Sequence, residues 1–394
     1  MSVQPRIRAQ AGLSLVELMI ALVIGTLLIL GVVQVFAASR AAYQLSEGLA
    51  RVQENGRFAM DFLQRDIRMA GHFGCVNDQA HALNNPPGMR TTFAATPHPG
   101  LDYAFSIRGY EAQGTQPSAM LDLSDGLTTG GDDYSPALPT EIASAASNRI
   151  DGSDIIVLRY LAPEGVPVTA IGGTAIAPVF HFDPARWNVL RSGADNPGLY
   201  GVADCLNATV FQANSVDPVA GTVTVGAAPV NASPDFTQLF TAGQTTLYRA
   251  ESVVYYVGMN GSGVPALYRL RFQAAPGGGL ASDPQELVEG IENLQIIYGV
   301  DRELSPSSPP SGFIDKQLVA SHSILSGQEE GWRRVGSVQV AVLASSPGRA
   351  AVAQASEDAA LLMGGGVLYT TPEDGRYRAV YQSTIALRNR LYGN

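Results

Sequence analysis

Charged residues and cysteines are scarce in this sequence. Only 15% of its 394 residues are charged, and the formal net charge is −10. A negative chain without a Lys/Arg cluster repels phosphate backbones, so we expect no nucleic-acid partner. The two cysteines, Cys75 and Cys205, are too few for a disulfide scaffold and are not spaced as zinc ligands.

Motifs of catalysis are also missing. The chain has no G-x-S-x-G elbow, no P-loop and no H-E-x-x-H pattern. Its histidines share no i, i+4 metal spacing, and we expect them in loops, in structural or solvated roles. They are His72, His81, His98, His181 and His322. The sequence therefore predicts no catalytic residue, metal site or cofactor, and no enzyme.

One acidic loop leaves two interpretations open. Its carboxylates could hold a hard cation through oxygen ligands, but they lack the one-three-five spacing of a calcium loop. A solvated loop is the favoured interpretation. The four residues are Asp122, Asp125, Asp132 and Asp133.

Apolar residues, glycine and proline are abundant. The apolar fraction is 46%, which is typical of a globular protein, and the chain has 42 Gly and 24 Pro. Many turn residues together with few charges favour short strands joined by turns. We therefore expect a β-rich body.

The N-terminus has the pattern of a membrane anchor. Residues 1–12 contain two arginines and no acid, and the run from Leu18 to Ser39 has no charge over about 22 residues. At ~1.5 Å per residue, a helix of this length is roughly 33 Å long and spans a bilayer core. The positive-inside rule then places the N-terminus in the cytoplasm and the rest of the chain in the periplasm.

In a secretory signal the small residue at the cleavage site follows the apolar run, whereas here the small residue, Gly12, precedes it. Because Gly12 precedes the run, a cut after it would remove only the basic leader and leave the helix attached. Glu17 is a carboxylate at the start of a spanning segment, where burial is costly. A cut before Leu13 would supply an α-ammonium one turn away, or facing the Glu17 of a packed neighbour, to neutralise it. The alternative is a plain signal anchor with an incidental glutamate.

The stretch Gly12-Leu13-Ser14-Leu15-Val16-Glu17-Leu18 resembles the class III signal of type IV pilins and type II secretion pseudopilins. The resemblance implies that prepilin peptidase cuts after Gly12 and that Leu13 becomes the N-methylated first residue. It also implies that Glu17 is the glutamate through which subunits dock. The chain departs from the family at Leu13, where the usual residue is Phe.

The helical pattern continues beyond the membrane run. Residues at spacings of three and four form one apolar stripe, charged residues interleave with it, and Gly71 is the expected stop. One helix of nearly 60 residues is predicted, with its second half packed on a sheet. The stripe consists of Leu45, Leu49, Val52, Gly56, Ala59, Leu63, Ile67 and Ala70. The segments 53–59 and 66–75 resemble the PilW class of minor pilins.

Beyond the helix, residues 76–150 have clear loop signals and are expected to form a loop-rich insertion. Asn260-Gly261 predicts a hairpin between strands 246–257 and 264–272. Further strands are expected at 154–160, 208–212, 294–300, 335–343 and 377–387. The patches 287–301, 332–343 and 384–390 also resemble PilW.

The two cysteines are well placed to join the helix to the sheet. Cys75 follows the helix and Cys205 precedes a strand, so a disulfide would close a loop of about 130 residues and stabilise the fold by roughly 4–5 kcal/mol. The alternative is a pair of buried thiols.

The sequence therefore predicts an α+β, type IV pilin-like fold, with a long helix packed on an antiparallel β-rich globular domain. The expected parts are the leader 1–12, the transmembrane and assembly helix 13–39, its amphipathic continuation 40–72, and the body 73–394.

The resemblance implies a minor pilin that is inserted in the inner membrane and later enters a pilus on the cell surface. There it would help to prime assembly near the tip and support adhesion and twitching motility. Its implied partners are prepilin peptidase, other minor pilins, the major pilin, the inner-membrane assembly machinery and, before assembly, membrane lipid. The alternatives are a J-type pseudopilin of a type II secretion system and a membrane-anchored periplasmic enzyme or binding protein.

Overall fold

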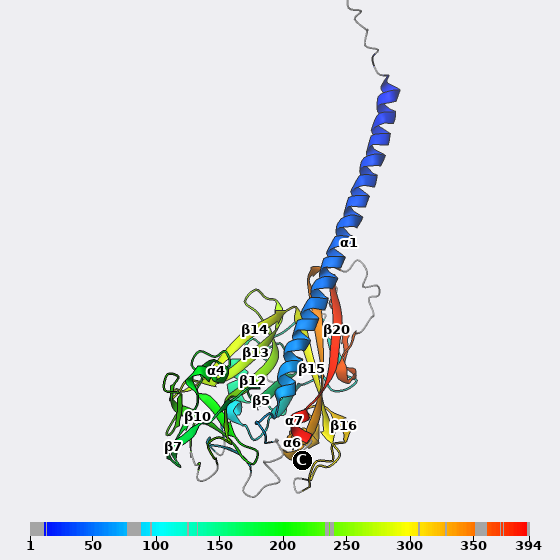
Figure 1. Cartoon of the computed structure of the whole chain (residues 1–394). Coiled ribbons are helices and arrows are strands. Elements are labelled where there is room, and N and C mark those ends of the chain that lie inside the picture. The colour runs from blue at the N-terminus through cyan, green and yellow to red at the C-terminus, as the bar shows by residue number, and fades with distance from the viewer. Residues whose placement is uncertain are drawn as a thin grey trace, which may run out of the picture.

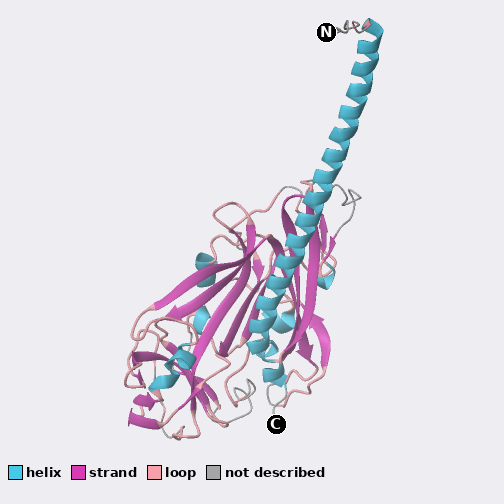
Figure 2. Ribbon diagram, turned by 45° about the horizontal axis from the view of Figure 1, so that its top comes forward, coloured by secondary structure: helices cyan, strands magenta, loops and turns pink. Residues whose placement is uncertain are grey.

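The computed structural model confirms a long N-terminal helix followed by a β-rich body (Figures 1 and 2). The helix α1 extends from one end of the body like a shaft, and its second half lies on the body. The structure describes residues 12, 14–76, 88–94, 97–123, 126–131, 133–232, 236, 240–305, 308–327, 329–350, 361–370, 372 and 374–391.

Helix α1 spans Leu15–Met69, 55 residues, close to the predicted length. Ser14 caps its N-terminus through its side chain. At the other end the chain leaves the helix at Ala70, and Gly71 has φ +76°, a conformation that glycine adopts without a steric penalty. Gly71 therefore follows the helix as expected.

A 13-stranded sheet forms most of the body, with the central order β4-β2-β5-β12-β9-β10-β11-β8-β7. Strands β13 and β14 extend it beside β12, while β1 pairs with β10 and β6 with β12. Its strands are β1 (Met89–Thr91), β2 (Ile107–Ala112), β4 (Tyr134–Ser135), β5 (Ile155–Leu161), β6 (Val166–Pro167), β7 (Ala170–Thr174), β8 (Ala177–His181), β9 (Leu199–Ala203), β10 (Ala208–Asp217), β11 (Thr222–Val225), β12 (Thr246–Met259), β13 (Pro265–Ala274) and β14 (Leu280–Glu289).

A second, four-stranded antiparallel sheet has the order β16-β15-β17-β20, and helix α1 packs against its strands β17 and β20. A small third sheet has the order β18-β19-β3. These strands are β3 (Met120–Asp122), β15 (Ile291–Asp301), β16 (Ile314–Leu318), β17 (Val335–Arg349), β18 (Leu361–Leu362), β19 (Leu368–Thr370) and β20 (Arg376–Ala386). The short helices are η1 (Pro99–Leu101), α3 (Thr140–Ala145), η2 (Pro184–Arg186), α4 (Trp187–Arg191), α5 (Ser323–Ser326), α6 (Glu329–Arg333), η3 (Gly364–Gly366) and α7 (Arg388–Leu391).

The strands expected from apolar or alternating runs are all present. The predicted hairpin around Asn260-Gly261 is the antiparallel pair β12 and β13. Strands β5, β10, β15, β17 and β20 match the other five expectations, with β10, β15 and β17 longer than predicted. Within 76–150 the sequence predicted no strand, yet β2 lies between β4 and β5 in the large sheet.

The main hydrophobic core lies where α1 meets the two sheets. It combines side chains of α1 with those of β5, β12, β15 and β17. A separate aromatic cluster, with Phe180, Phe211 and Phe236 in mutual contact, fills the part of the large sheet around β8, β10 and β11. Figure 1 places that part of the sheet, near the labels β7 and β10, at the end of the body away from the shaft.

Candidate functional site: the N-terminal helix and its attachment to the body

The first half of α1 exposes a long apolar surface. The exposed fractions of Leu15, Val35 and Phe36 are 74%, 71% and 68%, and those of Met19, Leu28 and Val32 are similar. Among the described residues, α1 is the one helix long and apolar enough to cross a membrane, and none of its most apolar window is buried in the body. Apolar surface of this extent is stable only when lipid or other helices cover it.

The exposed first half of α1 is long enough to cross the hydrocarbon core of a membrane. The first residue of α1 buried in the body is Gly48, so the shaft runs from Leu15 to Glu47. At ~1.5 Å per residue this shaft is roughly 50 Å long, which exceeds the hydrocarbon core of a bilayer. The body therefore stands clear of the membrane when the apolar run is embedded.

Glu17 and Ser14 form a capping box at the start of the shaft. The backbone N–H and the hydroxyl of Ser14 donate to Oε2 of Glu17, at 2.9 and 3.0 Å, and the N–H of Glu17 donates to Oγ of Ser14 at 3.2 Å. The S-x-x-E pattern of Ser14 and Glu17 is the sequence signature of this contact, which was not among the predictions. Gly12 is exposed, and Leu13 lies outside the described residues.

The second half of α1 is attached by its buried stripe. Val52, Ala59, Leu63 and Ile67 of the predicted stripe have 0% exposure, whereas Leu45 and Leu49 at its start are half-buried. At Gly56 the helix lies so close to β20 that an added Cβ would be 2.3 Å from the ring of Tyr381. Glycine at this position therefore sets the distance between helix and sheet.

Asp66 is a buried anchor that the sequence did not reveal. We expected it among the charged residues that interleave with the stripe, but it is 3% exposed. The hydroxyl of Tyr255 donates to its Oδ2 at 2.6 Å, and Arg269 lies 3.5 Å from the same oxygen. These partners offset the cost of burying a carboxylate. Burial and the Asp66 carboxylate in turn raise the pKa of Tyr255.

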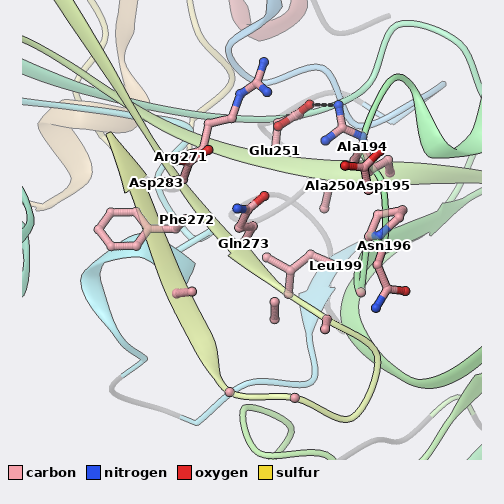
Figure 3. Close-up of a pocket in the computed structure, with 18 of the residues that line it drawn as sticks. Ala194, Asp195, Asn196, Leu199, Ala250, Glu251, Arg271, Phe272, Gln273 and Asp283 are labelled. Carbon is pink, nitrogen blue, oxygen red and sulfur yellow. Dashed lines mark ion pairs between the residues drawn. The ribbon is translucent and has the colours of Figure 1, made fainter. Parts of the chain in front are cut away.

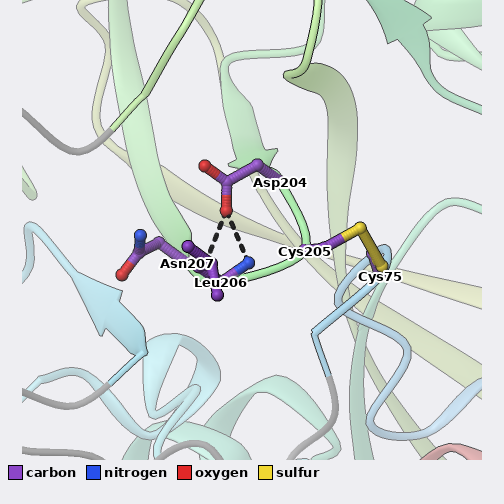
Figure 4. Close-up of a disulfide and its surroundings, with 5 residues drawn as sticks. All are labelled: Cys75, Asp204, Cys205, Leu206 and Asn207. Atoms are coloured by element: carbon purple, nitrogen blue, oxygen red, sulfur yellow. Dashed lines mark hydrogen bonds between the residues drawn. A yellow bond between two sulfur atoms is a disulfide. The ribbon is translucent and has the colours of Figure 1, made fainter.

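The disulfide between Cys75 and Cys205 is confirmed (Figure 4). It joins the segment just after α1 to the turn between β9 and β10, 130 residues further along the chain. In that turn, Oδ1 of Asp204 accepts hydrogen bonds from the N–H groups of Leu206 and Asn207, both at 2.7 Å. The end of the helix is thereby tied to the large sheet.

Two family models match the chain over the elements just described. The model of the prokaryotic N-terminal methylation motif matches residues 7–33, and that of type IV pilus-assembly protein W, PilW, matches residues 254–389. The predicted resemblance to the PilW class is confirmed. The methylation motif implies processing by prepilin peptidase in a pilus-assembly context. Comparison with curated proteins and with solved structures gave no match.

The PilW match covers the part of the body on which the helix lies. It begins within β12 and ends in α7, so it includes the sheet β16-β15-β17-β20 that α1 contacts. The methylation motif covers the start of the shaft. The single apolar helix and this motif fit a membrane-anchored pilin.

The histidines serve local structure where they are described. His72 contacts the carbonyl oxygen of Leu161 at 3.0 Å, and His98 and His322 each accept a backbone hydrogen bond two residues on. His181 corrects the expectation of loops, because it ends strand β8. His81 lies outside the described residues.

The acidic loop is only partly described. Asp122 lies in β3 and accepts a hydrogen bond from the hydroxyl of Thr370 at 2.6 Å, and Asp133 is exposed. Asp125 and Asp132 are outside the described residues. Among the residues that are described, no group of three or more His, Cys, Asp or Glu side chains could hold a metal ion.

A cavity of about 520 Å³ lies between the segment 193–199 and strands β12 and β13 (Figure 3). Its charged groups are the ion pair Arg249–Glu251, with Asp195, Arg271 and Asp283 around it. The described residues that line it include no serine, cysteine or histidine. The described lining of this cavity therefore contains no Ser–His or Cys–His pair.

Proposed function

We propose that this chain is a minor pilin that takes part in priming type IV pilus assembly. Prepilin peptidase cuts after Gly12, and Leu13 becomes the methylated first residue of the mature subunit. The body then lies in the periplasm, with the N-terminus of the precursor in the cytoplasm and the apolar helix in the inner membrane. On assembly, the helix leaves the bilayer and packs among those of other subunits.

The observation that carries this proposal is the exposed shaft. From Leu18 to Ser39 it has no charged residue, and its apolar side chains are exposed. The shaft projects from a folded body and begins with the sequence that the methylation model matches. A membrane anchor alone needs only the length of the apolar run. The motif adds the cleavage and assembly steps, since both depend on Gly12 and Glu17 at their positions before and within the helix.

The shaft also has sites for close helix contact. Gly25 and Gly31 lie within its apolar run, and an added Cβ at either position would meet nothing within 4 Å. Small residues allow two helices to approach closely in lipid or in a filament core. Helices of the major pilin and of other minor pilins are the proposed neighbours.

The large body supports a place near the pilus tip. A body of more than 300 residues is too bulky to repeat at every position along a filament. It fits at the end of the filament, where it has fewer neighbouring subunits. From that place the chain would support adhesion and twitching motility. The PilW match favours a pilus over the alternative of a type II secretion system.

Deleting the chain tests this proposal. We expect surface pili and twitching to be strongly reduced while the major pilin remains in the inner membrane, and a plasmid copy should restore both. The protein itself should be detected in pili sheared from complemented cells. Normal piliation of the deletion strain, together with absence of the chain from sheared pili, would refute the proposal.

A further inference from the structure

Strand β20 is a long sheet edge whose last eight residues lack the side chains that usually protect such an edge. It pairs with β17 and, within the described part of the chain, with no other strand on its far side. From Ala379 to Ala386 it contains no charged residue, no glycine and no proline. Natural proteins usually protect such edges, because unpaired N–H and C=O groups attract other strands.

Three other sheet edges in the described part of the body are protected. Strand β14 has Pro284 and three acidic side chains, and β16 is five residues long with Asp315 and Lys316. Strand β7 is five residues long and contains two glycines. The uncharged part of β20 therefore differs from these three described edges.

The edge of β20 lies beside α1, the helix that packs against the helices of other subunits in the proposed assembly. Strand β20 runs alongside the docked half of α1 (Figures 1 and 2), and Tyr381 on β20 contacts Gly56 on the helix. A neighbouring subunit that packs its helix on the shaft would thus bring its own body next to this edge.

We propose that the free edge of β20 receives an extended strand from the body of a different, neighbouring pilus subunit. The contact rests on the proposed function and consists of main-chain hydrogen bonds, for which eight residues offer roughly four outward-facing pairs of groups. The incoming segment is extended and uncharged, since β20 provides no charge for a partner between Ala379 and Ala386.

A second copy of this chain is a poorer occupant. Two identical edges usually pair antiparallel about a two-fold axis. Because β20 runs alongside α1, that arrangement would point the two shafts in opposite directions, and they would not share one membrane (Figure 1). A different subunit has no such restriction.

Site-specific photocrosslinking in the full-length chain in its own cells tests the proposal. A benzophenone amino acid at Gln382, which is exposed on β20, should form an adduct with a strand of another pilus subunit. The matched control is the same amino acid at Ser282, exposed on the protected edge of β14, where we expect roughly tenfold less adduct. No adduct at Gln382, equal adducts at both sites, or an adduct with a second copy would overturn the proposal.

A charge placed on the edge gives a second readout. Thr384→Lys should reduce the Gln382 adduct by roughly tenfold, whereas Ser282→Lys should leave it unchanged, because charged side chains block strand addition. Thermal unfolding of both variants verifies that the body still folds. If the chain enters sheared pili but Thr384→Lys leaves the adduct intact, the edge contact is wrong and the pilin role stands. If the chain never enters pili, the proposed function itself fails.

Discussion

The carboxylate of Glu17 has one visible task in the isolated chain and one proposed task in the filament. In the isolated chain it closes the capping box with Ser14. In the filament, we infer, it faces the α-ammonium of a subunit that begins at Leu13, and this charge pair lowers the cost of an acid among apolar helices.

Glu17→Ala should separate these two tasks. We expect the variant to be inserted and cleaved normally but to be missing from sheared pili, because the docking charge is gone. Ser14→Ala is the matched control: it loses the cap at a cost of about 1 kcal/mol but keeps the charge, and it should still enter pili. Immunoblots of membrane and pilus fractions measure both, and wild-type levels of Glu17→Ala in pili would contradict the docking role.

Loss of the disulfide should lower the stability of the folded body. Replacing both Cys75 and Cys205 with serine removes a constraint across 130 residues of the unfolded chain. The free energy of unfolding should fall by roughly 4–5 kcal/mol, as the loop-entropy model gives. Denaturant titration in detergent measures this, with the wild-type protein under reductant as a control that should show the same loss. A change below about 1 kcal/mol would show that the unfolded chain is not constrained in this way.

Among the elements, the contact of α1 with β20 depends on Gly56. A Cβ there would lie 2.3 Å from the ring of Tyr381, so helix and strand must move apart or the ring must turn away. Gly25 is the natural control, since it lies in the same helix with nothing within 4 Å.

Gly56→Ala should lower the free energy of unfolding of the body by roughly 1–3 kcal/mol through overpacking, despite the better helix propensity of alanine. Gly25→Ala should leave it unchanged. Adding Tyr381→Ala to Gly56→Ala should recover part of the loss, because it removes the ring that the new methyl group meets. Denaturation curves of the four proteins test this, and equal stability of Gly56→Ala and wild type would show that the contact is not tight.

Apolar periodicity made much of this fold predictable. The helix, the hairpin of β12 and β13, and strands β15, β17 and β20 have runs of apolar or alternating residues that reflect burial. Strand β14 was missed because it is an exposed edge with Pro284 and acidic residues, a composition typical of loops. Asp66 was missed because a buried acid is recognised only from its partners Tyr255 and Arg269, which lie about 190 and 200 residues away in the chain.

At the scale of the whole molecule, two buried carboxyl groups lie at the junction of the sheets. Asp154 is 2% exposed and accepts hydrogen bonds from the N–H of Ala112 in β2 and of Ile296 in β15, so it joins the large sheet to the second one. Glu111 is 1% exposed. Burial raises the pKa of both groups, and the charge of Asp154 raises that of Glu111 further.

The junction predicts that the body is more stable in mild acid than in base. In the folded state the pKa of Glu111 lies above its ordinary value of 4.5, and that of Asp154 lies above 3.8. At a pH above these ordinary values, the folded state therefore binds more protons than the unfolded state. The free energy of unfolding should therefore fall as the pH rises from about 5 to 9. Glu111→Gln mimics the protonated form and should flatten this slope. A wild-type slope that is flat, or equal to that of the variant, would contradict the assignment.

The mature N-terminus is the most direct test of the central claim, since cleavage after Gly12 distinguishes a subunit of the pilin and pseudopilin type from a plain signal anchor. Expressing the full chain with and without prepilin peptidase, followed by intact mass measurement and N-terminal sequencing, provides this test. With the peptidase, we predict a chain that starts at Leu13 and, in cells that methylate pilins, has one additional methyl group. Without it, the basic leader should remain. A mature start at any other residue, or processing that does not depend on the peptidase, would contradict the account.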